Sequence, residues 1–516
     1  MTPKAGRGLL RSTGIVSAMT MLSRILGLVR DMVVAYYFGA SAGADAFFLA
    51  FRIPNFFRRL FGEGAFSQAF VPVLAEFRAK RSAAEVKALL DKVSGTLGVT
   101  LLAITVAGVL GAEYIIKVFA AGYVYNGMDE KLGLAIDMLR LTFPYLMLIS
   151  MTAFAGSVLN TWNRFAVPAF TPVLLNISLI ACAVWLRGSL AEPVMALAWG
   201  VLIAGVAQLT FQIPFLAKEH LLPRPRVDFR HEGVRRIFTL MLPALFGVSV
   251  GQINLLLDTV LASFLVTGSL SWLYYSDRLL ELPLALFGIT IATVILPSLS
   301  KEHAEAGGEE FSRTLDWAMR MVIAIGMPAA LALVLLSESL ITTLFYQGQM
   351  TRHDVSMASL SLSAYGVGLV GHMLVKVLAP GYYSRQDTKS PVRFGIVALV
   401  SNMVLNLVLV WHLKHAGLAL ATSLSAFINA ALLWFGLRRT GALVHVPGWG
   451  RFIARIIFAN VVMCGVLILL TPDRGLWFDM AFGTRFAVML LICGAGALTY
   501  GAALAVAGFR FREMLR

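Results

Sequence analysis

The sequence predicts an all-α, polytopic membrane protein with about fourteen transmembrane helices. Hydrophobic residues make up 58% of the 516 residues and charged residues only 14%, whereas soluble globular proteins contain roughly 25% charged residues. The mean hydropathy is +0.79, which excludes a soluble enzyme, a disordered chain, a collagen and a coiled coil. Apolar residues also recur in stretches of about 20, the length of helix that crosses a bilayer core.

Fourteen apolar stretches follow one another along the chain and define the expected spans. They cover approximately residues 13–38, 45–76, 93–118, 134–158, 166–187, 193–217, 234–264, 270–299, 314–337, 356–382, 391–412, 415–437, 452–471 and 484–508. The second and eighth are long and interrupted by charged residues, Gly and Pro, so their edges are poorly defined. The first contains Arg24, Arg30 and Asp31, so we expect a retained transmembrane helix and not a cleaved signal peptide.

The basic residues favour a cytoplasmic location for both termini. The net charge is +15, and alternate loops between the fourteen spans hold most of the loop Lys and Arg, as the positive-inside rule requires. The basic loops and the binding of an anionic substrate explain the positive net charge, so binding to nucleic acid is not needed to explain it. The 3 Cys residues lie in apolar stretches without a CxxC spacing, so we expect neither disulfides nor a zinc site.

An internal repeat divides the chain into two lobes. Segment 52–74 resembles segment 278–299 at an offset of 226 residues, with Arg52 matching Arg278. Weak self-similarity of this kind is typical of transporters built from repeats. Six helices in each half give the two lobes the same orientation, related by a pseudo-two-fold axis along the membrane normal. The predicted domains are an N-lobe (1–217, helices 1–6), a basic cytoplasmic linker (218–233), a C-lobe (234–437, helices 7–12) and a C-terminal helix pair (438–516).

Ionisable residues inside the spans are the candidate functional residues, because each costs roughly 2.5–3.5 kcal/mol or more at the bilayer centre. They are Arg24, Arg30 and Asp31 in the first span; Asp45, Arg52, Arg58, Arg59 and Glu63 in the second; Asp258 in the seventh; Asp277, Arg278 and Glu281 in the eighth; and Lys376 in the tenth. Such groups face a polar cavity and not lipid, so these helices are expected to line a common chamber. Asp45, Arg52 and Arg59 recur every seven residues and therefore share one helix face.

Two interpretations of these charges are open. The chamber's Arg and Lys residues outnumber its carboxylates, and a planar guanidinium binds phosphate through two hydrogen bonds. This predicts a phosphate or pyrophosphate head group in the chamber. Alternatively, the charges neutralise one another. The pairs are then Arg30 with Asp45, Arg59 with Glu63, and Arg278 with Glu281.

A second polar set suits a small cation. It comprises Asp258, Asn402, Asn406 and Thr422, whose oxygens are hard ligands. Hydrogen bonds between helices are the alternative explanation. The sequence contains neither GxxxxGK[ST] nor HExxH, so we expect neither an ATPase nor another enzyme.

Four motifs stand out in the charged helices. They are SRILGLVRD (residues 23–31), ADAFF (44–48), EGAFSQAFVP (63–72) and YYSDRLLELP (274–283). These motifs resemble those of the MurJ (MviN-type) family of bacterial lipid II flippases, within the multidrug/oligosaccharidyl-lipid/polysaccharide exporter superfamily. The resemblance extends over essentially the whole chain.

The resemblance implies two six-helix lobes, and a C-terminal helix pair that forms a groove for the undecaprenyl tail. It also implies alternating access around a cationic cavity. The family's substrate-binding residues fall on Arg24, Arg30, Asp45, Arg58 and Arg278. A sodium site described for some members falls on Asp258, Asn402, Asn406 and Thr422, with Asn406 where those members have a carboxylate.

The expected function is therefore that of a flippase moving lipid II from the cytoplasmic to the periplasmic leaflet for peptidoglycan synthesis, and so for cell-wall biogenesis and cell shape. An exporter of another lipid-linked oligosaccharide, a cation-coupled drug exporter, a membrane enzyme acting on lipid-linked sugars and a scaffold are the alternatives. No cofactor is expected, although Na⁺ or membrane-potential coupling is open. Lipid II and the bilayer are the expected partners, with peptidoglycan-synthesis proteins as further candidates. We expect a monomer in the bacterial inner membrane.

Overall fold

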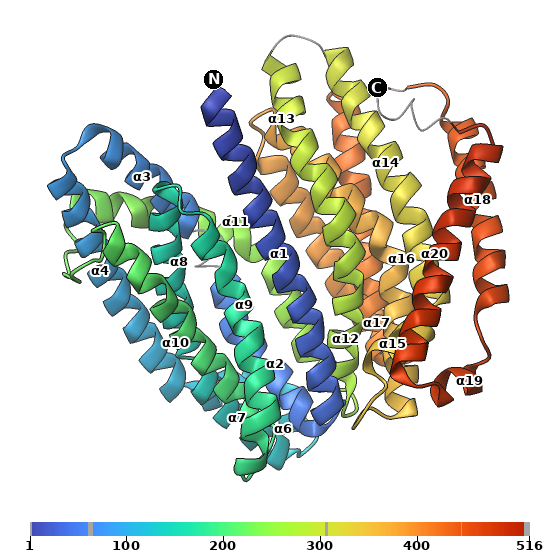
Figure 1. Ribbon diagram of the computed structural model, residues 1–516, viewed down its shortest axis with the longest axis horizontal. Helices are drawn as coiled ribbons and strands as arrows, with labels where there is room; N and C mark the ends of the chain where they lie inside the picture. The colour runs from blue at the N-terminus through green and yellow to red at the C-terminus, as the bar shows by residue number, and fades with distance from the viewer. Residues whose placement is uncertain (1–2, 60–65, 305–307, 445, 510–516) are drawn as a thin grey trace. The chain divides into compact units, whose positions relative to one another are not determined.

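The computed structural model describes residues 3–59, 66–304, 308–444 and 446–509, and every regular element among them is a helix (Figure 1). The chain divides into two compact units, Met1–Gly268 and Ser269–Arg516.

Eleven α-helices lie in the described part of the first unit, drawn from blue to green in Figure 1. They are α1 (Pro3–Phe38), α2 (Ala42–Phe57), α3 (Phe66–Lys80), α4 (Ala83–Leu110), α5 (Ala112–Phe119), α6 (Ala121–Tyr125), α7 (Asp129–Thr142), α8 (Tyr145–Thr161), α9 (Ala166–Ala181), α10 (Met195–Lys218) and α11 (Glu232–Ser263). α1 packs against α9, and α2 packs against α7.

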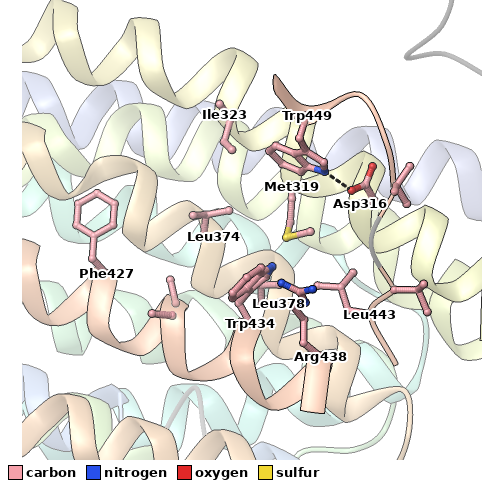
Figure 2. A pocket seen from close by; sticks show the side chains of 14 residues that line it. Asp316, Met319, Ile323, Leu374, Leu378, Phe427, Trp434, Arg438, Leu443 and Trp449 are labelled. Atoms are coloured by element: carbon pink, nitrogen blue, oxygen red, sulfur yellow. Dashed lines mark hydrogen bonds between the residues drawn. The ribbon is translucent and has the colours of Figure 1, made fainter. Parts of the chain in front are cut away.

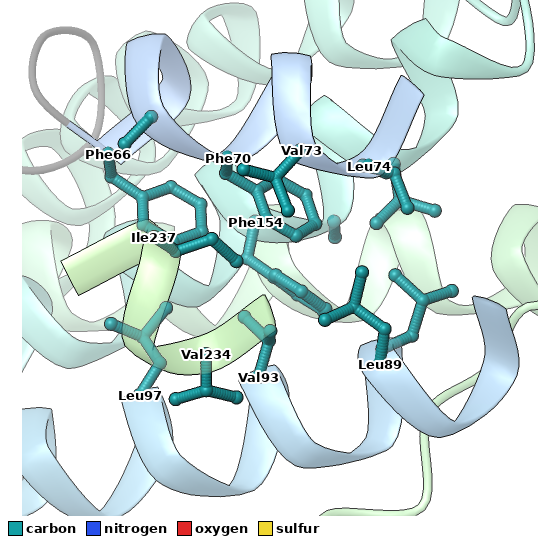
Figure 3. Packing of buried hydrophobic residues seen from close by; sticks show 14 of the residues in the cluster. Phe66, Phe70, Val73, Leu74, Leu89, Val93, Leu97, Phe154, Val234 and Ile237 are labelled. Atoms are coloured by element: carbon teal, nitrogen blue, oxygen red, sulfur yellow. The ribbon is translucent and has the colours of Figure 1, made fainter. Parts of the chain in front are cut away.

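A buried aromatic and aliphatic cluster holds α3, α4, α8 and α11 together (Figure 3). Phe70 of α3 lies against Phe154 of α8, with ring centroids 5.3 Å apart. Leu97 of α4 and Ile237 of α11 belong to the same cluster. Such close-packed side chains fix the positions of the helices that carry the polar residues.

The segment between α10 and α11 is docked along α4. The backbone N–H of Arg226 donates to the carbonyl of Asp91 at 2.9 Å, and that of Asp228 donates to Oγ1 of Thr96 at 3.0 Å. A Cβ at Gly95 would meet the backbone of Arg226 at 2.4 Å, so the close approach requires glycine. The predicted basic linker is thus an ordered part of the first unit.

The second unit, drawn from green to red in Figure 1, is built around α16. Its described helices are α12 (Ser269–Pro283), α13 (Thr290–Ala304), α14 (Gly308–Leu335), α15 (Ser337–Phe345), α16 (Arg352–Tyr383), α17 (Lys389–Arg439), α18 (Trp449–Leu470), α19 (Arg474–Asp479) and α20 (Phe482–Val506). α16 packs against α12, α14, α15 and α17. α18 and α20 pack against each other, α18 also contacts α14, and α20 contacts α15.

Among the described residues, each of the fourteen predicted ranges contains helix, and 10 of the described helical segments are long and apolar enough to cross a membrane. One of these, α17, contains two predicted spans. They join at Lys414, where φ is 50° and ψ is −128°, so the chain reverses direction between two helices. The polytopic all-helical class is confirmed, and the number of fourteen spans stays a prediction.

The two interrupted spans share an unusual turn. α2 passes into a π-helical turn at residues 58–59, and α12 passes into a π-helix at Leu284–Ile289. The starts of these turns, residues 58 and 284, are separated by the same 226 residues as the sequence repeat. This coincidence supports the equivalence of α2 and α12.

The compact units differ from the predicted domain boundaries at α11. The repeat placed residues 234–264 in the C-lobe, but α11 packs against α2, α3, α4, α5 and α6 and belongs to the first unit. Polar and apolar contacts between α11 and helices far away in sequence cause this difference. The predicted boundary came from counting six helices in each half, which does not reveal such contacts.

Candidate functional site

Two predicted arginines lie on α1 in different surroundings. Arg24 is exposed, whereas Arg30 is 9% exposed. The Arg30 guanidinium donates to Oδ1 of Asp31 at 2.6 Å and to Oδ1 of Asn176, on α9, at 3.0 Å. The Asn176 amide in turn donates to the carbonyl of Ser23 at 2.9 Å. Arg30 is therefore held in place by α1 itself and by its neighbour α9.

One face of α2 lies along α11. Arg52 donates to Oγ1 of Thr259 at 2.6 Å, and Arg59 donates to Oε1 of Gln252 at 3.4 Å. Both partners are on α11 and are also seven residues apart. The predicted face of α2 thus makes two side-chain hydrogen bonds to α11, a helix that the sequence repeat assigned to the other lobe. Asp258, the residue before Thr259 on α11, is 9% exposed.

Asp45 lies at the start of the same face and is 1% exposed. Its carboxylate accepts from Nζ of Lys131, on α7, at 2.8 Å and from the backbone N–H of Gly268 at 2.8 Å. The Lys131 ammonium also lies 4.4 Å from the ring centroid of Tyr123. Asp45 therefore joins α2 and α7 to the segment that follows α11.

Arg58 lies at the end of α2. It is partly buried and donates to Oδ1 of Asn55 at 2.8 Å, within the π-helical turn at the end of α2. Glu63, the predicted partner of Arg59, lies outside the described residues. Arg30 forms an ion pair with Asp31, and Asp45 forms one with Lys131; the expected pair between Arg30 and Asp45 stays a prediction.

In the second unit, Arg278 and Glu281 form the expected ion pair on α12. The distance from Nη1 to Oε2 is 3.0 Å, and the side chains are 29% and 41% exposed. Asp277 is partly buried beside them, and Lys376 on α16 is exposed. Because these charged side chains are accessible, Arg278 can still bind a ligand despite its ion pair with Glu281.

The polar set on α17 forms a hydrogen-bonded chain between the two halves of that helix. Asn406 donates to Oδ1 of Asn402 at 2.8 Å, and Asn402 donates to Oγ1 of Thr422 at 3.4 Å. Asn402 and Asn406 are each 0% exposed. The structure thus joins three residues of the predicted cation set within the second unit, while Asp258 belongs to the first unit.

The described residues supply cations, and they supply no metal cluster. In that part of the chain no group of three or more His, Cys, Asp or Glu residues could hold a metal ion. Guanidinium groups on α1, α2 and α12 can bind an anion such as phosphate.

Sequence reasoning missed three partners that the structure reveals. Lys131 lies outside the predicted spans, and Asn176 and Gln252 are uncharged residues within them. A charged or amide side chain within or beside an apolar stretch was the available signal, because such a group seeks a polar partner in the membrane. Its partner in space could not be read from the sequence.

The comparisons of sequence with known proteins match the chain to one family. The family described as "Lipid II flippase MurJ" matches residues 34–485. The chain is 50% identical over 513 residues to "Probable lipid II flippase MurJ" of Vibrio cholerae, covering 98% of this chain and 97% of that protein. It is 44% identical over 463 residues to "Lipid II flippase MurJ" of Burkholderia cenocepacia, covering 89% of each.

Solved structures give the same result for the fold. The structure "Lipid II flippase MurJ, inward closed conformation" matches with a TM-score of 0.81 and 28% identity, covering 97% of this chain and 99% of that one. An inward-facing multidrug resistance MATE transporter of the MOP superfamily matches with a TM-score of 0.67 and 15% identity, covering 83% of this chain and 98% of that one. The second likeness concerns the fold alone.

Proposed function

Because the chain belongs to the MurJ family of lipid II flippases, we infer that it translocates lipid II across a membrane for peptidoglycan synthesis. The observation that carries this inference is the 50% identity over 98% of the chain with a relative of that name. The chain is a multi-pass membrane protein with the all-helical fold of that family.

We propose that accessible arginines bind the pyrophosphate of the substrate. Arg24 and Arg58 in the first unit and Arg278 in the second each present a guanidinium that is exposed or only partly buried. Arg30 is fixed by Asp31 and Asn176, so it acts as a rigid positive charge on the same helix as Arg24. Charge-assisted hydrogen bonds of this kind are the strongest that a membrane protein can offer a phosphate.

The proposal extends to the rest of the substrate and to the cycle. The sugars occupy a hydrated cavity, and the polyprenyl tail stays in the bilayer along α18 and α20. The protein alternates between inward- and outward-open states without changing its substrate covalently. It works as a monomer in the bacterial inner membrane, with both termini in the cytoplasm, as the loop charges favour. Proteins of peptidoglycan synthesis are candidate partners.

Depletion of the protein in its own bacterium tests the function. We expect lipid II at the periplasmic face of spheroplasts to decrease while total lipid II stays level or rises. Unchanged periplasmic lipid II after depletion would mean that the chain carries another anionic lipid.

Replacement of Arg24 tests the binding residues. As the only copy, Arg24→Ala should lower translocation roughly tenfold or more, because one charge-assisted hydrogen bond is worth about 1.5–3 kcal/mol. Arg140→Ala is the matched control, since Arg140 is exposed and pairs with Asp137 on its own helix. Normal growth of the Arg24→Ala strain at normal protein abundance would remove Arg24 from the site.

Coupling to Na⁺ is a separate proposal for the polar set on α17. Asn402, Asn406 and Thr422 offer amide and hydroxyl oxygens, which suit a hard cation, but they already bond to one another. If they bind Na⁺, replacing Na⁺ by choline should lower translocation, and Asn406→Leu should abolish that sensitivity. Equal rates in both salts would leave the set as a helix contact.

A further inference from the structure

Two cavities adjoin at one end of the second unit, where α14, α17 and α18 meet. The first has a volume of about 500 Å³ and lies between α14, α16, the second half of α17 and the segment before α18. Its lining is mainly aliphatic and aromatic, and includes Ile323, Leu374 and Phe427. Trp434, Arg438, Asp316 and Trp449 lie at the opposite end from Phe427 (Figure 2). The cavity is therefore apolar at one end and amphipathic at the other.

The second cavity has a volume of about 620 Å³ and is basic. Arg313 and Arg320 come from α14, seven residues apart, and Arg451 and Arg455 come from α18, four residues apart. These spacings place each pair on one face of its helix. Asp316 and Val446 line both cavities, so the basic cavity opens beside the amphipathic end of the apolar one.

The arginine cluster keeps positive charge for a ligand. Asp316 accepts from Nε of Arg320 at 2.7 Å and from Nε1 of Trp449 at 2.7 Å. Arg313 pairs with Glu309 at 2.7 Å. No carboxylate pairs with Arg451 or Arg455 within the described ranges, and their guanidinium groups are exposed and partly buried, respectively. Two of the four arginines are therefore available to an anion.

We propose that this pair of cavities binds an acidic diacyl phospholipid. The phosphate lies among Arg313, Arg320, Arg451 and Arg455, and one acyl chain enters the apolar cavity between α14, α16 and α17. A basic pocket between transmembrane helices is a typical site for an anionic head group. Tryptophans at the junction are typical of the boundary between head groups and hydrocarbon. The loop charges place this end of the unit on the cytoplasmic side.

The adjoining apolar cavity favours a phospholipid over a free phosphate ion. A free phosphate ion would use the arginines and leave about 500 Å³ of apolar surface unused. That volume falls within the range of roughly 300–1,000 Å³ for small-ligand sites, which suits one acyl chain. A polyprenyl tail, much longer than an acyl chain, would have to leave the cavity past Phe427. The observations therefore favour a membrane phospholipid and not the substrate, and the proposal does not depend on flippase activity.

Binding of defined lipids to the purified full-length chain tests the proposal without lipid II. The probes are phosphatidylglycerol and phosphatidylcholine with the same acyl chains, added to delipidated protein and followed by native mass spectrometry. We expect phosphatidylglycerol to bind at least tenfold more tightly, with an affinity that falls as salt is added. Equal affinity for the two lipids would overturn the proposal.

Paired variants locate the site. Arg451→Gln with Arg455→Gln should weaken phosphatidylglycerol binding roughly 25-fold, since each basic residue near a lipid phosphate contributes about fivefold. Arg393→Gln with Arg439→Gln is the matched control, because both residues are exposed on α17 and outside both cavities. Equal losses in the two double variants would show that only overall charge matters and would overturn the site.

A third variant tests the acyl-chain cavity. Ala431 lines this cavity and is exposed, so Ala431→Trp can fill it without disturbing the buried core. It should weaken binding of long-chain phosphatidylglycerol severalfold and leave binding of soluble glycerol phosphate unchanged. Full displacement of the lipid by inorganic phosphate would indicate a free-phosphate site. Tighter binding of undecaprenyl phosphate than of phosphatidylglycerol would assign the cavities to the substrate tail, and either result would refute the phospholipid proposal.

Discussion

At the residue scale, the structure gives Asp45 a structural role beside the substrate role that the family resemblance implies. The family resemblance assigns it to the substrate, yet its carboxylate is 1% exposed and is bound by Lys131 and by the N–H of Gly268. A buried carboxylate with these partners ties three segments of the first unit together. Its importance to the protein can therefore be structural as well as electrostatic.

Replacing Asp45 should reveal this structural role. Asp45→Asn leaves the buried Lys131 ammonium without a carboxylate, and breaking a buried ion pair costs about 3–5 kcal/mol. We expect a lower midpoint of thermal unfolding in detergent. Asp45→Leu with Lys131→Met should recover much of the loss, because it removes both charges together. Unchanged stability of Asp45→Asn with lost translocation would instead assign Asp45 to the substrate.

The candidate residues show what a sequence can and cannot reveal. The spacing of Arg52 and Arg59 predicted a shared helix face, and the structure places both against α11. The expected pair of Arg278 and Glu281 is present because its members are neighbours on one helix turn. The partner of Asp45 is 86 residues away, and no local pattern identifies a contact of that range.

At the element scale, the chain reverses direction inside α17 at Lys414, whose backbone is strained. Lys414 has φ 50° and ψ −128°, a conformation that costs a residue with a side chain about 1–3 kcal/mol and costs glycine little. Lys414→Gly should raise the free energy of unfolding by about 1 kcal/mol, measured by chemical denaturation. Lys414→Ala retains the Cβ and should give no such gain. Destabilisation by Lys414→Gly would mean that the turn is not strained.

The docked segment between α10 and α11 predicts a dependence on pH. Burial lowers the pKa of His231 below its usual 6.5, with Lys92 acting in the same direction. Because the neutral imidazole is favoured in the folded protein, its stabilising effect is complete above pH 6.5 and is lost as the pH falls through the lowered pKa. The Lys92 ammonium lowers the pKa of Asp228 below 3.8, so that carboxylate stays charged throughout this range.

Hydrogen exchange can measure this effect. After correction for intrinsic rates, protection of residues 221–231 should decrease as the pH is lowered below 6.5. His231→Gln should remove this dependence, and His220→Gln should retain it, because His220 is an exposed residue at the start of the same segment. Protection that does not change between pH 7.5 and 5 would exclude His231 as the cause.

The elements themselves were largely predictable. Apolar stretches of about 20 residues located helices in all fourteen predicted ranges, because the bilayer leaves few alternatives to a helix. The place of α11 was not predictable in the same way. The repeat assigned it by counting, whereas Ile237 and its neighbours bury it among α3, α4 and α8.

At the scale of the whole molecule, the family membership predicts interchangeability. The chain is 50% identical to its Vibrio cholerae relative over 97% of that protein. Expressed in Vibrio cholerae depleted of that relative, it should restore growth and normal cell shape. The Arg24→Ala variant should not restore growth, and Arg140→Ala should. Failure of the unaltered chain at normal abundance would indicate a different lipid substrate.

The paired π-helical turns carry information about ancestry. The turns begin at residues 58 and 284, at equivalent positions of the two repeats. A duplication of one repeat would produce such a pair, with the widened turn already present in the single copy. Each half places an arginine, Arg52 or Arg278, six residues before its turn. The two arginines differ in what they bind, Thr259 in one half and Glu281 in the other, while the geometry that presents them is the same.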